Sequence, residues 1–126
     1  MVIDSSVLIA ILVSEPEAEQ FARAIADDAK RLVSAVSVLE TAIVIGARKG
    51  VLGNREFDLL MYKAELDVVA MNADQVQLAR EAYHKFGKGR HPAGLNLGDC
   101  CSYALSRYSG ERLLFKGNDF AQTDVN

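Results

Sequence analysis

The chain has 126 residues, of which half are hydrophobic and a quarter charged, and its formal net charge is −3 at pH 7. The hydrophobic fraction is too high for an intrinsically disordered chain, and nine glycines and two prolines exclude collagen-like or low-complexity sequence. At this length we expect a single domain, residues 1–126, with its own core. The acidic excess argues against a general polyanion binder, because such binding depends on many Lys and Arg contacts to phosphate. The composition does not exclude a nucleic-acid substrate that is held at a local site.

Cysteine usage and hydropathy indicate a soluble, cytoplasmic protein. Cys100 and Cys101 are neighbours, and adjacent residues of a helix point in different directions, so a disulfide between them is unfavourable. The longest apolar run, 7–13, has seven residues, against about 20 needed to cross a bilayer. No basic segment precedes this run, so it does not match a secretory signal.

Short apolar runs alternate with amphipathic segments along the chain. We expect strands at 1–3, 31–34, 67–70 and 113–115, and helices at 16–25, 36–49, 56–64, 73–86 and 99–108. The run 7–13 fits a buried strand or a buried helix, and Ser5 or Ser6 as an N-cap favours the helix. Gly50, which follows two basic residues, is typical of a helix C-terminus. This alternation predicts βαβ units, and hence a parallel sheet covered by helices on both faces.

Four acidic residues from distant parts of the chain should meet at one edge of this sheet. Asp4 directly follows the first strand, and Asp119 follows the fourth. Glu40 lies in the first turns of the helix after the second strand, and Asp99 opens the helix that leads into the fourth. Because parallel sheets bind ligands outside the carboxyl ends of their strands, we expect the four carboxylates to converge on one crevice.

Each of these acids also has a purely structural explanation. Asp4 could cap a helix, Asp99 suits the positive end of a helix dipole, and the last acid lies in a Gly-Asn-Asp turn. Glu40 would complete a capping box if Ser37 were the N-cap, and would lie a turn deeper if Ser34 were. Four like charges in one crevice nevertheless need protons or cations to neutralise them. Oxygen ligands without Cys or His suit Mg²⁺ or Mn²⁺, which can polarise a phosphate and help to deprotonate water.

The segment that leads into Asp99 is basic and contains no acid. It carries Lys85, Lys88 and Arg90, with His91 beside them. A solvated surface loop explains this pattern equally well. Beside a metal site, Lys88, Arg90 and His91 would be substrate-binding residues for a phosphodiester, and Arg suits bidentate contacts to phosphate.

Four segments, in this order, carry a family resemblance. They are Asp-Ser-Ser at 4–6, Ser-Val-Leu-Glu at 37–40, Leu-Asn-Leu-Gly-Asp-Cys at 95–100 and Leu-Phe-Lys-Gly-Asn-Asp-Phe at 114–120. The chain thereby resembles the PIN-domain ribonucleases over essentially its whole length, and most closely the VapC-like toxins of type II toxin–antitoxin pairs. The resemblance implies a three-layer α/β/α sandwich on a mostly parallel sheet of four or five strands. It also implies Mg²⁺- or Mn²⁺-dependent endonucleolytic cleavage of RNA, a homodimer, and a cognate antitoxin that blocks the acidic crevice.

Carried over residue by residue, the resemblance gives the four acids catalytic roles. Asp4 and Asp99 would ligate the metal directly. Glu40 would hold or activate a water, and Asp119 would complete the site or bind a second metal. Ser6 matches the hydroxyl position that supports the first Asp. Many relatives carry another acid just upstream of the last one, where this chain has Gly or Asn, so occupancy of a second metal stays open.

Two other functions fit parts of the sequence. A phosphoacceptor receiver domain has a doubly wound fold of this length, with an Asp at the end of a central strand and a Lys at the end of a late one. Lys116 could be that Lys, but the run 67–70 is followed by Met-Asn and not by Asp. A binding module without activity would keep the fold, but four converging acids argue against it.

Overall fold

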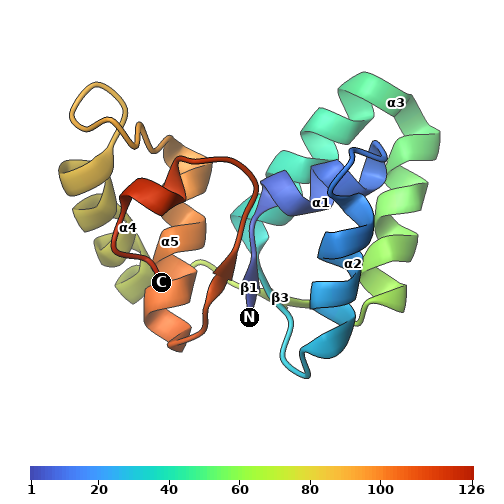
Figure 1. Cartoon of the computed structure of the whole chain (residues 1–126), viewed down its shortest axis with the longest axis horizontal. Helices are drawn as coiled ribbons and strands as arrows, with labels where there is room; N and C mark the ends of the chain where they lie inside the picture. Colours follow the sequence, from blue (N-terminus) through green and yellow to red (C-terminus); the bar gives the residue numbers. More distant parts are fainter.

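A four-stranded parallel sheet forms the centre of the computed structural model, which describes residues 1–126 (Figure 1). The strands are β1 (Val2–Ile3), β2 (Leu32–Ser34), β3 (Asp67–Val69) and β4 (Leu113–Leu114), in the spatial order β3-β2-β1-β4. All neighbouring pairs are parallel, as the sequence predicts. The carboxyl ends of the strands therefore meet at one edge of the sheet.

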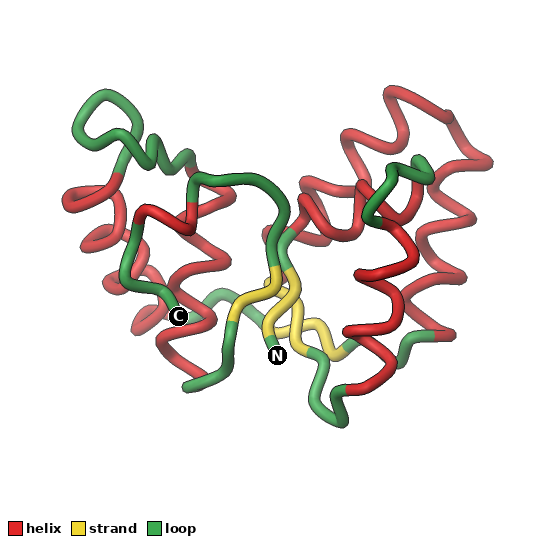
Figure 2. Tube along the Cα trace, viewed as in Figure 1, coloured by secondary structure: helices red, strands yellow, loops and turns green.

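Five α-helices and one 3-10 helix surround the sheet. They are α1 (Ser5–Leu12), α2 (Ala18–Asp27), α3 (Ala35–Lys63), α4 (Ala73–Phe86), α5 (Leu97–Ser109) and η1 (Phe120–Gln122). Figure 2 shows the short strands between two groups of helices, α1 to α3 on one side and α4 with α5 on the other. This arrangement confirms the predicted α/β/α sandwich. None of the helices combines the length and the apolar character needed to cross a membrane.

Successive residues of the strands point into two different cores, because side chains alternate between the faces of a sheet. Ile3 and Val33 face the α1–α3 layer, where the core is completed by Leu8, Phe21, Ile25, Ile45 and Phe57. Val2 and Leu32 face the other layer, where the core is completed by Ala82, Leu95, Tyr103, Leu105 and Leu113. Both faces of the sheet are therefore covered, and only its edges are open to ligands.

The apolar run 7–13 is helical. α1 begins at Ser5, and its N-cap is Asp4, whose side chain accepts a hydrogen bond from the Ser6 N–H. The expectation that Ser5 or Ser6 caps this helix is therefore wrong. Asp is as good an N-cap as Ser, so the structural explanation of Asp4 holds alongside any role at the sheet edge.

Other predicted helix ends also differ from the structure, among them those of the helix predicted at 16–25, which is α2 at Ala18–Asp27. The segments 36–49 and 56–64, expected as helices separated by a loop, belong to one element, α3, which is interrupted only at Gly50. Gly50 has φ 64°, a conformation that favours glycine, so the predicted break is present but the helix resumes at the next residue. α5 begins at Leu97, two residues earlier than predicted, because the Asn96 side chain caps it.

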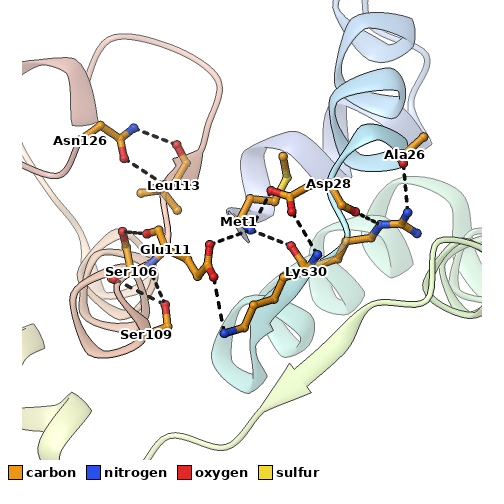
Figure 3. A network of polar contacts seen from close by, with 10 residues as sticks. Met1, Ala26, Asp28, Lys30, Ser106, Ser109, Glu111, Leu113 and Asn126 are labelled. Carbon is orange, nitrogen blue, oxygen red and sulfur yellow. Dashed lines mark hydrogen bonds and ion pairs between the residues drawn. The ribbon is translucent and has the colours of Figure 1, made fainter.

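A network of polar contacts closes the amino end of the sheet, opposite the edge that carries the acids (Figure 3). The Met1 amino group lies 3.0 Å from Asp28 Oδ2, 2.6 Å from the Lys30 carbonyl oxygen and 3.4 Å from Glu111 Oε2. Lys30 Nζ lies 3.4 Å from the other Glu111 oxygen. The starts of β1, β2 and β4 are thereby joined by charged groups.

Cys100 and Cys101 are free, as expected, and both are buried in α5. Burial raises the pKa of the Cys100 thiol to about 11, and it also raises the pKa of the Cys101 thiol. Both side chains are therefore neutral thiols at physiological pH and are poorly suited to act as metal ligands or nucleophiles.

Candidate active site

Asp4 lies at the carboxyl end of β1, where only 2% of it is exposed. Its Oδ2 accepts a hydrogen bond from the Ser6 N–H at 3.0 Å, and its Oδ1 accepts one from the Ser102 hydroxyl at 2.6 Å. Ser102 belongs to α5, so the second bond joins Asp4 to the opposite helix layer. Both carboxylate oxygens are thus held in fixed directions, and each keeps a lone pair for a further ligand.

Glu40 lies one turn deeper in α3 than a capping position. The N-cap of α3 is Ser34, whose hydroxyl accepts a hydrogen bond from the Val36 N–H, so the capping-box explanation of Glu40 is wrong. Glu40 Oε1 instead accepts a hydrogen bond from the Ser5 hydroxyl at 2.6 Å. Gly98 packs against the same carboxylate: a Cβ at this position would lie 2.5 Å from Glu40 Oε2. The start of α5 therefore fits closely over Glu40 only because residue 98 has no side chain.

Asp99 lies in the first turn of α5 and forms a capping box with Asn96. Its Oδ2 accepts a hydrogen bond from the Asn96 N–H, and its own N–H donates to Asn96 Oδ1. Burial raises the pKa of the Asp99 carboxyl to about 6 against the lowering effect of the Asn96 bond. Repulsion by Asp4, Asp119 and Glu40 also raises this pKa. The charges of the other three predicted acids therefore all act on Asp99.

Asp119 is the most loosely held of the four acids. It is exposed on the turn between β4 and η1, two residues after Gly117, whose φ of 94° makes the turn. It reaches the site from the β4 side, since its charge contributes to the raised pKa of Asp99. The turn explanation of Asp119 is correct, and its role in the acidic site stays a prediction.

The four carboxylates share the sheet edge without enclosing one point. No three or more His, Cys, Asp or Glu side chains form a group arranged to hold a metal ion. The donor chemistry nonetheless fits a hard cation, because the site offers carboxylate oxygens and neither thiolate nor imidazole. A divalent cation beside Asp99 would also offset the repulsion that raises its pKa.

Ser6 has a different role from the one expected for its hydroxyl. It supports Asp4 through its backbone N–H, whereas its Oγ accepts a hydrogen bond from the Lys116 N–H at 3.0 Å. The Lys116 ammonium forms ion pairs with Glu15 and, at 3.2 Å, with Glu17. Ser6 and Lys116 together therefore fasten the segment after β4, which carries the fourth acid, to the α1–α2 layer.

The basic loop before α5 leaves two positive side chains at the surface. Lys88 and Arg90 are exposed, and the Arg90 guanidinium lies 5.8 Å above the centre of the Tyr83 ring. His91 is used within the loop: its Nδ1 accepts a backbone N–H at 3.0 Å, and its ring packs edge-on against Phe86. These contacts order the loop on α4, from which it leads directly into α5.

A large groove on the surface lies beside the four acids and not over them. This groove has a volume of about 950 Å³ and runs between α4, α5 and the start of α3. Most of its lining is apolar and includes Val36, Val76, Tyr83, Leu97 and Cys100. Leu97 is 78% exposed, although it is two residues from Asp99. An apolar surface therefore borders the acidic site.

Sequence reasoning missed two serines that hold the acids in place, Ser5 and Ser102. Ser102 follows Asp99 by three residues and so shares its helix face, but this spacing does not indicate its bond to Asp4. Ser5 lies at an ordinary helix start, and nothing in the sequence indicates that its hydroxyl bonds Glu40.

The family model of the PIN domain matches residues 1–126. The chain belongs to the PIN-domain family. The alternative of a receiver domain is therefore wrong. The chain is 57% identical over 125 residues to a protein named Ribonuclease VapC from Mycolicibacterium smegmatis, a match that covers 99% of this chain and 97% of that protein.

Two solved structures share the PIN fold of this chain. One is VapC20 of Mycobacterium tuberculosis, described as a sarcin-ricin loop cleaving toxin, with a TM-score of 0.76, 18% identity and coverage of 95% of this chain and 92% of that one. The other is a toxin-antitoxin complex from Klebsiella pneumoniae, with a TM-score of 0.73, 16% identity and coverage of 98% and 92%. At these identities the similarity concerns the fold alone.

Proposed function

We propose that this PIN-domain protein is a Mg²⁺- or Mn²⁺-dependent endoribonuclease that acts in the cytoplasm as the toxin of a type II toxin–antitoxin pair. The observation that carries the proposal concerns Asp99, whose pKa is raised by burial and also by the charges of Asp4, Asp119 and Glu40. The high identity to a protein named as a ribonuclease supports the same activity.

In the proposed mechanism, Asp4 and Asp99 would hold the cation, and Asp119 would complete the site. When bound, Mg²⁺ or Mn²⁺ would polarise the scissile phosphate and stabilise the leaving oxygen. Glu40 orients the attacking water and takes up its proton at Oε2, because Oε1 already accepts the Ser5 hydroxyl. Glu40 has the geometry for this task, since Ser5 and Gly98 fix its carboxylate from two sides.

Lys88, Arg90 and His91 are the proposed contacts to the RNA backbone. Lys88 and Arg90 are exposed and lie on a loop that ends at the start of α5. Arg90 is partly ordered by Tyr83, so less side-chain freedom is lost when it binds a phosphate. RNA bound along this loop would approach the acids from the α4–α5 side.

Two exposed apolar surfaces support the proposed protein partners. On α3, Leu39 and Ile43 are 62% and 63% exposed, lie one helical turn apart and flank Glu40 in the sequence. A cognate antitoxin segment that covers them would also cover the acidic site. The apolar part of the groove between α4 and α5, with Val76 and Leu97 in its wall, would be buried in a homodimer that leaves Arg90 of the same groove accessible to RNA. Large exposed apolar patches commonly mark such interfaces.

Incubation of the purified, antitoxin-free protein with total RNA tests the proposal. With Mg²⁺ or Mn²⁺, new 5′ ends should appear at defined positions, and Asp99→Ala should abolish them. Asp74→Ala is the matched control, because Asp74 also lies in the first turn of a helix but belongs to the exposed start of α4. Cleavage that persists in Asp99→Ala would remove this site from the mechanism, and the absence of metal-dependent cleavage by the wild-type protein would refute the proposed function.

A further inference from the structure

We propose that Ser102 is a positioning residue, which with Ser37 fixes the orientation in which Asp4 meets a divalent cation. The proposal rests on the function proposed above. It concerns three buried side chains from three different elements. Asp4 follows β1, Ser37 lies in the first turn of α3, and Ser102 lies in α5. Ser37 and Ser102 are both fully buried, and Asp4 is 2% exposed.

The hydrogen bonds between these side chains have one consistent direction. The Ser102 hydroxyl lies 2.6 Å from Asp4 Oδ1, and a carboxylate oxygen accepts but does not donate, so the single Ser102 proton is directed at Asp4. The Ser37 and Ser102 oxygens lie 3.1 Å apart. Because the Ser102 proton is already used, Ser37 must be the donor in this contact. The hydrogen bonds are therefore donated from Ser37 to Ser102 and from Ser102 to Asp4.

This direction matters for a metal ligand. A hydroxyl that receives one hydrogen bond becomes a better donor for the next, and a donor to a carboxylate forms one of the stronger hydrogen bonds in proteins. The 2.6 Å distance between Ser102 Oγ and Asp4 Oδ1 lies in the range of such bonds. Together with the Ser6 N–H on Oδ2, Ser102 determines the plane of the carboxylate and so the direction of its remaining lone pairs.

The same serines connect the elements that carry the other acids. Ser37 precedes Glu40 by three residues on α3, and Ser102 follows Asp99 by three residues on α5. Their contact therefore fixes α3 against α5 beneath the acidic site. A change at either serine would alter the relative position of the acids as well as the orientation of Asp4.

Mn²⁺ titration calorimetry on serine variants tests this inference apart from any cleavage assay. Loss of a hydrogen bond that orients a metal ligand weakens metal binding by about 10-fold to 100-fold. We expect an increase of this size in the Mn²⁺ dissociation constant for Ser102→Ala and an increase of about two- to threefold for Ser37→Ala, because that variant keeps the direct bond to Asp4. Ser102→Thr keeps the hydroxyl and should retain Mn²⁺ affinity close to that of the wild type.

Ser106→Ala is the matched control. Ser106 lies one turn further along α5, is 3% exposed and donates to the Glu111 carbonyl oxygen at the same distance of 2.6 Å. The Ser106→Ala variant should lower the melting temperature about as much as Ser102→Ala does, and it should leave Mn²⁺ affinity unchanged. Equal Mn²⁺ affinity in Ser102→Ala, Ser106→Ala and the wild type would overturn the inference. Should Ser102→Ala not fold, unchanged affinity in Ser37→Ala would overturn it. Failure of the wild type to bind Mn²⁺ would instead refute the proposed function.

Discussion

Asp99→Asn should stabilise the protein at neutral pH in a buffer with EDTA, although it removes a proposed metal ligand. Burial and repulsion by the neighbouring acids raise the pKa of Asp99 from 3.8 to about 6. A change of this size corresponds to a cost of about 3 kcal/mol for the ionised form at neutral pH. Because the side chain is partly exposed, solvent screening reduces the expected gain to about 1–1.5 kcal/mol. Asn keeps an oxygen that can accept the Asn96 N–H, so the helix cap is retained.

The sign of the pH dependence follows from the raised pKa. Between pH 4 and 6 the folded protein holds a proton on Asp99 that the unfolded chain releases, so this contribution to stability is present below about pH 4 and is lost as the pH rises through about 6. Thermal unfolding of both proteins from pH 4 to 8 measures the effect. The melting temperature of Asp99→Asn should equal that of the wild type near pH 4 and exceed it by about 4–6 °C at pH 7.5.

Asp74→Asn is the control for this series, because it removes a carboxylate from the first turn of α4, a helix that carries none of the four acids of the site. It should change stability by at most about 0.5 kcal/mol and in the opposite direction, through loss of a favourable dipole interaction. Adding Mn²⁺ should reverse the order of Asp99→Asn and the wild type, since only the wild type gains stability from bound metal. A constant difference from pH 4 to 8, or a less stable Asp99→Asn at pH 7.5, would refute the electrostatic reasoning.

Three further substitutions test other parts of the structure. Gly98→Ala should change the free energy of unfolding by less than about 1 kcal/mol, because the end of the Glu40 side chain can move away and Ala favours the helix. The displaced Glu40 carboxylate should nevertheless lower RNA cleavage by at least about 10-fold. Full activity would contradict the proposed role of Glu40. Ser34→Ala should lower the free energy of unfolding by about 1 kcal/mol through loss of the α3 cap, and an unchanged denaturation midpoint would contradict that assignment. Arg90→Ala should weaken RNA binding and reduce the slope of log affinity against log salt concentration by about 1, measured between about 50 and 200 mM salt. An unchanged slope would remove Arg90 from the phosphate contacts.

The sequence was sufficient to predict the layers of the fold and the edge at which the acids meet. Short apolar strands alternating with helices require parallel pairing, and parallel pairing places the ends of β1, β2 and β4 together. The position of Asp4 follows directly from that rule. The helix boundaries were less predictable, because Asp4 and Asn96 cap their helices through side-chain bonds that compete with other good caps nearby.

The supports of the acids could not be predicted from the sequence alone. The Ser5 bond to Glu40 joins residues 35 positions apart, and the Ser102 bond to Asp4 joins residues 98 positions apart. Serine is common at helix starts and within helices, so its identity does not indicate such a partner. These bonds depend on how α1, α3 and α5 pack against the sheet, which only the three-dimensional structure provides.

The central claim is that the four acids bind a divalent cation at the edge of the sheet. Calorimetric titration of Mn²⁺ into the wild-type protein and into the double variant Asp4→Asn, Asp99→Asn tests it most directly. Saturable binding by the wild type that is lost in the double variant is the predicted result. Equal Mn²⁺ affinity in the two proteins would contradict the claim.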